Sequence, residues 1–370
     1  MRKWLAMLVM FLGVVSGRSP LSRPRYTFPM PPVSIIATEL NEIGDIARVV
    51  DSLLAQEPPP AEIVIVDGGS TDGTWEWLAG EASREPRLIA MRDESCSLKH
   101  SRGPVSRGRN VAIAAAKSSI IACADAGCTY APDWLGNLTA RIAAGEAEYA
   151  LGGTCLDPDA HTIWDIASAP FFSVRLSPLE PTKSCTARSM AFTKELWQRI
   201  GGFPEQVLVG EDTLFDLEAR RQTRPDFVVN AKALYRPLNT FRSACRQMKR
   251  YAISDGQAGV RWMRLFRNSA RCLLQIAALV AVRWTVLPIL FVFVLEAWYA
   301  FHRDWRILPR FGFKAVLARF AFSVVVPWLV AFNQIRGRFS ASLSATGRIK
   351  GTEQHRSPAS SRLPRINSRK

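Results

Sequence analysis

The sequence has few cysteines, and no two of them have metal-binding spacing. Its seven cysteines are an odd number among 370 residues, and none belongs to a C-x-x-C pair. Structural metal sites of the zinc-ribbon kind are built on such pairs, so this class of site is excluded. We expect seven reduced thiols in a cytosolic domain.

Glycine-rich phosphate-binding motifs are also missing. The glycines that follow Asp67 do not have the spacing G-x-G-x-x-G, and no Gly-Lys-Ser/Thr comes after them. This excludes the dinucleotide-binding fingerprint and the P-loop. A sugar-phosphate nucleotidyltransferase would show a glycine-rich stretch with Arg and Lys near its first strand. That stretch is absent too, which disfavours this class without removing it.

Acidic residues are scarce at the C-terminal end of the chain. The formal net charge is +16, and from Arg336 onward nine Lys and Arg stand against Glu353 alone. A basic segment rich in Ser, Pro and Gly is predicted to be disordered and solvated. Such a tail can contact anionic lipid or nucleic acid. We expect no nucleic-acid partner, since the tail alone points to one.

Hydrophobic runs occur near both ends of the chain. Trp4 to Val15 is typical of a signal peptide or short anchor, although no small-x-small cleavage site follows. Leu273 to Ala300 is long enough to span a bilayer, and Ala315 to Phe332 barely so. Arginines flank both ends of both later segments, so the positive-inside rule predicts no topology. We expect a membrane hairpin or in-plane helices; a buried helical subdomain is the alternative.

Between these regions, strand and helix patterns alternate. This alternation predicts an α/β fold with a mainly parallel sheet flanked by helices. The expected strands are 33–38, 62–66, 88–91 and 120–124, and the expected helices are 42–56, 74–80, 110–117, one opening at 132 and one over 213–220.

Asp67 ends a strand that is apolar throughout. In an open parallel sheet, ligands bind beyond the carboxyl ends of the strands. Gly68 and Gly69 let the backbone turn there without a Cβ in the way. A carboxylate at this position can accept hydrogen bonds from a base or a ribose; a solvated turn is the alternative.

An ordered series of motifs resembles the family-2 glycosyltransferases. It runs, over about residues 33 to 260, through VSIIATELNE (33–42), IVDGGSTDG (65–73), RGRN (107–110), ADAG (124–127), PDWL (132–135), GGFP (201–204), GED (210–212) and RQMKRY (246–251). Each motif is weak by itself, but their order and spacing make the series specific.

The resemblance implies a GT-A-like (Rossmann-like) fold and an enzyme. It implies transfer of a sugar from a nucleotide-sugar donor, most often of the UDP type, to a hydroxyl of a glycan or lipid-linked acceptor. The transfer would be inverting. The sequence is also similar to family members that end in membrane-associated helices and build cell-surface polysaccharides or glycolipids. The corresponding organisation is a hydrophobic segment (1–30), a GT-A domain with its catalytic face in the cytoplasm (31–260), membrane-associated helices (261–335) and a basic tail (336–370).

The resemblance also assigns donor-binding residues. Asp67 corresponds to the carboxylate that reads the base, and Thr38 and Glu42 fall in the stretch that lines the nucleoside pocket. Arg109 stands where a basic residue approaches the donor, with Arg107 as a substitute. Alternatively, these residues have only structural roles: Thr38 at a strand end, Glu42 in a first helical turn, and the two arginines in surface ion pairs.

Asp125 departs from the family pattern. The family usually has Asp-x-Asp here, with one acid near the ribose or metal and the other holding the metal on the diphosphate. In this chain the run is Asp125-Ala126-Gly127, so the second acid is missing. A hard cation bound through substrate phosphates needs only one or two protein carboxylates. We therefore expect Mg²⁺ or Mn²⁺ on Asp125; the thiol of Cys128 suits softer metals.

The later motifs imply the catalytic and acceptor residues. Asp212 is the expected general base, with Glu211 as its neighbour. Alternatively, both acids only complement a helix dipole. Helical spacing places Gln247, Arg250 and Tyr251 on one face. Arg250 is expected to brace the departing diphosphate, and Gln247 and Tyr251 to face the acceptor or product.

Three other functions stay open on the sequence alone. A catalytically impaired relative that binds donor or acts as a scaffold is favoured by Gly127. A nucleotidyltransferase is disfavoured by the missing glycine-rich stretch, and a nucleic-acid binder is favoured by the basic tail alone.

Overall fold

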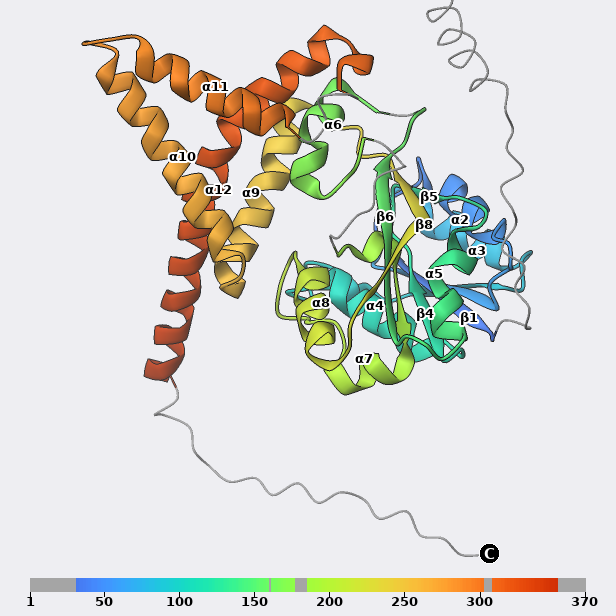
Figure 1. Cartoon of the computed structure of the whole chain (residues 1–370). Helices are drawn as coiled ribbons and strands as arrows, with labels where there is room; N and C mark the ends of the chain where they lie inside the picture. Colours follow the sequence, from blue (N-terminus) through green and yellow to red (C-terminus); the bar gives the residue numbers. More distant parts are fainter. Residues whose placement is uncertain (1–30, 160, 177–184, 303–307, 352–370) are drawn as a thin grey trace, which may run out of the picture. The chain divides into compact units, whose positions relative to one another are not determined.

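The computed structural model describes residues 31–159, 161–176, 185–302 and 308–351, without the side chains of Pro309 and of 341–351. The predictions made for the hydrophobic segment 4–15 and for residues 352–370 of the basic tail lie outside these ranges. The described part of the chain begins where the first predicted strand does (Figure 1).

An eight-stranded sheet forms the centre of the fold, in the order β3-β2-β1-β4-β7-β6-β8-β5. Four of its seven strand pairings are parallel: β1 with β2, β1 with β4, β2 with β3, and β6 with β8. The strands are β1 (Val33–Glu39), β2 (Glu62–Asp67), β3 (Leu88–Arg92), β4 (Ile120–Cys123), β5 (Cys128–Tyr130), β6 (Tyr149–Leu156), β7 (Met190–Thr193) and β8 (Asp226–Tyr235). The predicted α/β class with a mainly parallel sheet is confirmed.

Helices cover both faces of this sheet. Alternate residues of β1 and β2 point to opposite faces, as strand geometry requires. Ile35, Ile63 and Ile65 pack with α2 (Ile46–Leu54), α3 (Thr74–Ala82) and α5 (Trp134–Ala143). Ile36, Val64 and Val66 pack with α4 (Pro104–Ala115), α7 (Lys194–Ile200) and α8 (Glu211–Gln222). These apolar strands are therefore buried on both sides.

One predicted helix begins earlier than its motif indicated. The expected helix at 110–117 is α4, which opens at Pro104 and ends at Ala115. Proline suits the first helical turn, because its missing N–H would have no partner there. The Arg107-Gly-Arg109 motif therefore lies inside the helix, and Gly108 contacts the strand end at Thr38: a Cβ on Gly108 would come within 3.0 Å of the Thr38 Cβ.

The chain continues into a helical layer. Its members are α6 (Ile163–Ser168), α9 (Phe241–Ala258), α10 (Trp262–Ala281), α11 (Leu287–Phe301) and α12 (Phe313–Gly351), and the short 3-10 turns are η1 (Glu94–Cys96), η2 (Ala169–Phe172), η3 (Ala187–Ser189) and η4 (Leu308–Phe311). Helices α9 and α12 approach closely at two glycines. A Cβ on Gly256 would lie 2.1 Å from the Gln334 carbonyl oxygen, and one on Gly337 would lie 2.1 Å from that of Ile253. The predicted boundary at residue 260 therefore separates helices that pack against each other.

The first hydrophobic region is not one long segment. Leu273 to Ala300 divides into α10 and α11 at residues 282–286, close to the polar Arg283 and to Pro288 in the first turn of α11. This region is therefore two helices, although its length alone would suffice for one span of a bilayer. Within the described residues, the helix long and apolar enough to cross a membrane is Phe313–Ser340, and half of its apolar window is buried inside the protein.

Candidate active site

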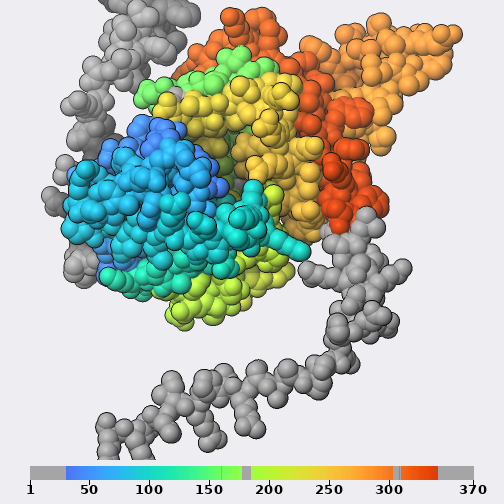
Figure 2. Space-filling view, turned by 180° about the vertical axis from the view of Figure 1, so that it is seen from behind, coloured from blue at the N-terminus to red at the C-terminus, as the bar shows by residue number. Residues whose placement is uncertain are grey.

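Two adjoining cavities lie beyond the carboxyl ends of β1, β2 and β4. The strand-end pocket is lined by Thr38, Glu39, Leu40, Glu42, Val66, Gly68, Cys96, Pro104, Val105, Asp125 and Ala126. The central pocket continues from it, because Val105 and Asp125 line both. The central pocket is also lined by residues of α8 and α9, by Arg188 and by Phe171 and Phe172. Figure 2 shows a recess between the N-terminal part of the chain (blue to cyan) and α9 (yellow).

The Asp67 motif folds into a turn that its own carboxylate holds. Asp67 is fully buried, and its Oδ1 accepts hydrogen bonds from the backbone N–H groups of Gly69 and Ser70, both at 2.9 Å. Gly69 has φ +97°, which favours glycine. Gly68 lies so close to η1 that a Cβ would come within 2.9 Å of the Cys96 carbonyl oxygen. The motif thus brings backbone, rather than side chains, to the wall of the pocket.

The two loops that follow β1 and β2 are fastened together. Asn41 donates its N–H to the Ser70 hydroxyl (2.8 Å), and Glu42 donates its N–H to the Thr74 hydroxyl (2.8 Å). Asp72 accepts from the Ile43 N–H at 3.1 Å. These bonds fix Glu42 beside the strand ends. Thr38 and Glu42, both predicted to contact a nucleoside, line the strand-end pocket.

Glu39 is the most unusual group in the strand-end pocket. It is 3% exposed, and neither carboxylate oxygen has a hydrogen-bond partner within the part of the chain that the structure describes. Burial raises the pKa of Glu39 well above its ordinary value, and the nearby Glu42, Asp125 and Asp67 add to the shift. Partial burial and Asp45 likewise raise the pKa of Glu42. Unpartnered buried oxygens facing a cavity are acceptors available to a ligand's hydroxyls.

We expect Glu39→Gln to stabilise the free protein increasingly as the pH rises. Below the unfolded-state pKa, near 4.5, the Glu39 carboxyl is protonated in both states. Above it, the unfolded chain releases the proton while the folded chain retains it, so wild-type stability falls until the pH passes the raised folded pKa. Glutamine has no such titration. Denaturant unfolding of both proteins from about pH 4.5 to about pH 8 measures the difference.

Glu42→Gln is the matched control, because the pKa of Glu42 is also raised although its side chain is only half-buried. The difference in unfolding free energy between each variant and wild type should grow with pH, and more for Glu39. A difference that stays constant across the pH range would contradict the assignment of Glu39 as a buried, unpaired acid.

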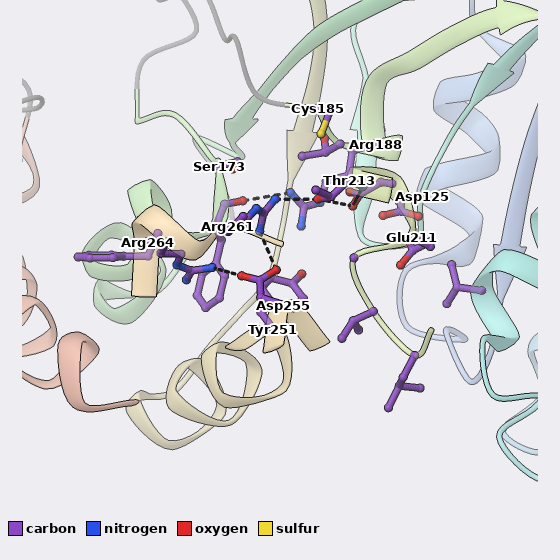
Figure 3. Close-up of a pocket in the computed structure, with 18 of the residues that line it drawn as sticks. Asp125, Ser173, Cys185, Arg188, Glu211, Thr213, Tyr251, Asp255, Arg261 and Arg264 are labelled. Carbon is purple, nitrogen blue, oxygen red and sulfur yellow. Dashed lines mark hydrogen bonds and ion pairs between the residues drawn. The ribbon is translucent and has the colours of Figure 1, made fainter. Parts of the chain in front are cut away.

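Arg109 joins the strand-end acid to the acids of α8. It is 2% exposed; its Nη2 donates to Asp125 Oδ1 at 2.7 Å, and its Nη1 donates to Glu211 Oε1 at 2.6 Å. Its guanidinium also lies 5.4 Å from the ring of Phe203. The predicted donor-binding residue is thus the link between two motifs 86 residues apart in the chain. Figure 3 shows Asp125 and Glu211 on the same side of the cavity.

Asp125 stands where the two pockets meet, and its side chain is 32% exposed. Among the described residues no group of three or more His, Cys, Asp or Glu is placed to hold a metal ion. Gly127 has φ +71°, so the position that lacks the second acid also has a backbone favourable to glycine. A lone carboxylate here suits a hard cation only where substrate phosphates supply most of the cation's ligands.

Asp212 and Glu211 occupy the first turn of α8 after Gly210, whose φ is +83°. Burial raises the pKa of Glu211, while Arg109 opposes the shift. Asp212 is less buried, and its Oδ1 accepts from the Thr213 N–H at 2.6 Å. Both acids line the central pocket. The two neighbours therefore differ: Glu211 is held by an arginine, whereas Asp212 is fixed by its own helix.

Arg188 is a buried cation of the central pocket that the sequence did not reveal. It is 7% exposed, and its guanidinium lies 4.1 Å from the ring of Tyr235. Within the described residues it makes no ion pair; its Nη1 lies 3.5 Å from the Phe172 carbonyl oxygen. A buried guanidinium without a carboxylate partner is costly, so this side of the pocket favours an anionic ligand. Nothing in the run Thr186-Ala-Arg-Ser189 sets it apart as a site in the sequence.

The other wall of the central pocket is a separate ion-pair cluster. Asp255 of α9 accepts from Arg264 at 2.9 Å and from Arg261 at 3.4 Å, and Arg261 also donates to the Thr213 hydroxyl at 2.7 Å (Figure 3). This cluster attaches the start of α10 to α8. The predicted motif on α9 ended at Tyr251, so these residues were missed.

The three residues predicted on α9 are not all brought to the pocket. Tyr251 lines it and packs on Phe172, with ring centroids 5.6 Å apart, and burial raises its pKa to about 12. Gln247 lies one turn away and donates from Nε2 to the Tyr251 hydroxyl at 3.4 Å. Arg250 is exposed and does not line this pocket. Of the two arginines predicted to contact the donor, Arg109 lines the central pocket and Arg250 does not.

Part of the chain is similar to a known protein family. Residues 34–198 match the family model described as "Glycosyl transferase family 2", which confirms the resemblance carried by the motif series. This match covers the strand-end pocket, Arg109, Asp125 and Arg188. It ends before α8 and α9.

Two curated proteins of Rhizobium meliloti (strain 1021) are similar to parts of the chain. "Succinoglycan biosynthesis protein ExoO" is 34% identical over 122 residues, or 33% of each chain. "Succinoglycan biosynthesis protein ExoU" is 38% identical over 109 residues, or 30% of each chain. The chain therefore aligns with about a third of the length of these relatives.

Solved structures show likeness over longer stretches at lower identity. A mannosyltransferase from Pyrobaculum calidifontis, solved with GDP-Man and Mn²⁺, aligns over 90% of this chain and 85% of its own with 20% identity and a TM-score of 0.46. S. aureus TarS 1–349, solved with UDP, aligns over 88% of this chain and 93% of its own with 17% identity and a TM-score of 0.43.

Proposed function

We propose that the protein transfers a sugar from a nucleotide-sugar donor to an acceptor hydroxyl by inverting single displacement, in the synthesis of a cell-surface polysaccharide or glycolipid. The family 2 domain supports glycosyl transfer, and the two relatives support a role in exopolysaccharide synthesis. The observation that carries the proposal is the Arg109 bridge. It connects Asp125, at the end of the strands, with Glu211, beside Asp212, so that the predicted donor side and the predicted base share one cavity.

Each pocket has chemistry suited to one part of the donor. In the strand-end pocket, the carboxyl group of Glu39 is buried and both of its oxygens lack a partner among the described residues; Asp67 Oδ2, buried at the end of β2, lacks one too. They suit the N–H of a base and the hydroxyls of a ribose. In the central pocket, the guanidinium of Arg188 suits the diphosphate, since arginine binds phosphate oxygens strongly. The donor would therefore lie across Asp125 with its sugar toward α8.

Asp212 is the proposed general base. An inverting displacement needs one carboxylate to take the acceptor proton while the bond to the diphosphate breaks on the opposite side of the sugar carbon. Asp212 keeps an oxygen available for this step, because its hydrogen bonds to Thr213 are made by Oδ1. Glu211 is engaged by Arg109 and positions that arginine instead.

A divalent cation, Mg²⁺ or Mn²⁺, is part of the proposal. Asp125 would hold it together with the phosphates of the donor, and the cation would neutralise charge on the leaving diphosphate when bound. Because one oxygen of Asp125 already accepts from Arg109, the cation would depend mostly on the donor for its ligands.

A screen of nucleotide sugars for thermal stabilisation, with and without Mg²⁺ or Mn²⁺, tests the proposal. A ligand that binds only the folded chain raises its melting temperature, and at a given concentration a tighter ligand raises it more. We expect one nucleoside diphosphate sugar to stabilise the protein more than the free sugar or the nucleoside monophosphate does. Lack of stabilisation by every nucleotide sugar would contradict the proposal and favour a catalytically impaired relative.

We expect Asp67→Asn to weaken binding of the nucleoside diphosphate by about 10- to 100-fold, since a charge-assisted hydrogen bond contributes roughly 1.5–3 kcal/mol. Asparagine retains an oxygen for the Gly69 and Ser70 N–H groups, so the turn should survive. Calorimetric titration of the nucleotide measures the effect. Asp72→Asn is the control, because that carboxylate is exposed and accepts hydrogen bonds within the neighbouring turn, whereas Asp67 is fully buried. Equal affinities for Asp67→Asn and wild type would remove Asp67 from the donor site.

A further inference from the structure

The carboxylate of Asp212 is held by its neighbour in the chain, Thr213. Two groups of Thr213 donate to Asp212 Oδ1, the backbone N–H at 2.6 Å and the side-chain hydroxyl at 3.3 Å. The hydroxyl by itself is a weak restraint, because a threonine O–H can rotate toward any acceptor within reach. Whatever fixes the direction of this hydroxyl therefore decides how firmly the carboxylate is oriented.

Arg261 fixes that direction. Its Nη2 donates to the Thr213 hydroxyl oxygen at 2.7 Å (Figure 3). Since a guanidinium has only donors, the hydroxyl oxygen is the acceptor in this bond, and the hydroxyl hydrogen is left for Asp212. The positive charge also polarises the O–H group and strengthens its donation. Arg261, Thr213 and Asp212 thus form a chain of hydrogen bonds from the start of α10 to the first turn of α8.

The backbone of Arg261 is held from two other helices. Its φ of +56° lies in the left-handed region, which residues other than glycine rarely adopt. Such a conformation persists only where the surrounding contacts impose it. Gln334 of α12 donates from Nε2 to the Val260 carbonyl oxygen at 3.0 Å and to that of Arg261 at 3.4 Å. The Val260 N–H is held as well, by the carbonyl oxygen of Asp255 in α9 at 3.0 Å. The turn therefore presents the Arg261 side chain to α8.

The ion pair with Asp255 does not account for the position of Arg261. Asp255 accepts from Arg264 at 2.9 Å and from Arg261 only at 3.4 Å, so Arg264 is its main partner. The side chain of Arg264 is also the less exposed of the two, at 17% against 36%. The shorter bond of Arg261 is the one to Thr213, which points to a role at α8.

We propose that Arg261 is a positioning residue for sugar transfer: through the Thr213 hydroxyl it orients the carboxylate of Asp212, so that Oδ2 is directed at the acceptor hydroxyl. Arg261 itself contacts neither the sugar nor the proton that Asp212 takes. This inference rests on the proposed function, because it needs Asp212 as the base. It adds that the helical layer contributes to catalysis, through the turn that joins α9 to α10.

Steady-state transfer by an Arg261→Gly variant of the full-length protein tests the assignment. Glycine suits the φ of +56°, and Asp255 keeps its pair with Arg264, so the free energy of unfolding should stay near that of the wild type. The kcat should fall by about ten- to a hundredfold, since a small misplacement of a reacting group costs this much. The KM for the donor should not change. Arg267→Met is the matched control, because Arg267 is an exposed arginine of the same helix outside the central pocket, and its kcat should equal that of the wild type.

Variants of Thr213 test whether Arg261 acts through this hydroxyl. Thr213→Val has nearly the same shape and retains the backbone N–H bond to Asp212, and its kcat should fall to about the level of Arg261→Gly. Thr213→Ser retains a hydroxyl and should restore most of the wild-type rate. The double variant Arg261→Gly, Thr213→Val should be no slower than the slower single variant, because members of one hydrogen-bond network do not contribute additively.

Several results would overturn the proposal. Losses of kcat that multiply in the double variant, or a raised donor KM in Arg261→Gly, would mean that Arg261 contacts a ligand directly. A fall in kcat accompanied by a lower free energy of unfolding would make Arg261 a structural residue, and a wild-type kcat in Arg261→Gly would remove its role. Asp212→Asn separates the two levels. If that variant loses transfer while Arg261→Gly does not, the positioning role is wrong and the proposed function stands, whereas a wild-type chain that transfers no sugar would contradict both.

Discussion

An Asp212→Asn variant is expected to bind the nucleotide sugar as the wild type does and to transfer the sugar about 10²–10⁴-fold more slowly, the usual contribution of a positioned acid or base. Asparagine retains the oxygen that accepts from the Thr213 N–H, so the start of α8 should stay in place. It cannot take the acceptor proton. Transfer has to be measured with the true acceptor, because hydrolysis of the donor by water need not use the same base.

Glu218→Gln is the matched control for Asp212. It lies on the same helix, pairs with Arg221 at the surface, and does not line the central pocket. Its transfer rate should equal that of the wild type. If Asp212→Asn also transfers sugar at the wild-type rate, the base lies elsewhere, and Glu211 becomes the next acid to substitute.

Replacing Arg109 by methionine is expected to lower the free energy of unfolding by about 3–5 kcal/mol, the cost of removing one partner from a buried ion pair. The change leaves Glu211 buried without its cation and Asp125 without a partner on its inner side. Because Asp125 retains access to solvent, the lower end of the range is expected. Denaturant unfolding measures the loss.

Two further variants isolate the role of Arg109. Arg107→Met removes an arginine from the same helix whose pair with Glu205 is exposed, and exposed pairs contribute only about 0–1 kcal/mol. Arg109→Lys retains the charge but cannot hold two carboxylates with one planar group, so it should fold and show reduced transfer. An Arg109→Met protein as stable as the Arg107→Met protein would contradict the bridge.

The N-terminal half of the sheet could be predicted from the sequence because its strands are short apolar runs between clear turn signals. The first strands and their ends agree with the structure to within a residue or two, and Asp67 stands at the strand end where the pattern placed it. Strands β5, β6, β7 and β8 were missed. Much of β8 is exposed, and β6 and β7 contain Gly, Ala and Met rather than β-branched runs.

Site residues could be predicted only where a sequence motif determines the local backbone structure. The acids of Gly210-Glu-Asp212 lie in the first turn of α8, as their pattern indicated. Arg109 was identified as a donor contact, whereas its bonds to Asp125 and Glu211 depend on tertiary contacts across 16 and 102 residues. Arg188 and Asp255 have no periodic or motif signal, because their importance comes from burial. Glu39 lies in the motif at 33–42, from which roles were predicted only for Thr38 and Glu42. Its lack of hydrogen-bond partners depends on the folded structure.

The structure of the reaction product is the most direct test of the proposed inverting transfer. The wild-type chain is supplied with the nucleotide sugar that stabilises it and with a lipid-linked glycan acceptor, and the product is examined by mass spectrometry and by nuclear magnetic resonance of its new anomeric centre. Inverting transfer should give a mass gain of one sugar and an anomeric configuration opposite to that of the donor, both absent with Asp212→Asn. A product that retains the donor's configuration, or donor binding with no transfer to any hydroxyl acceptor, would contradict it.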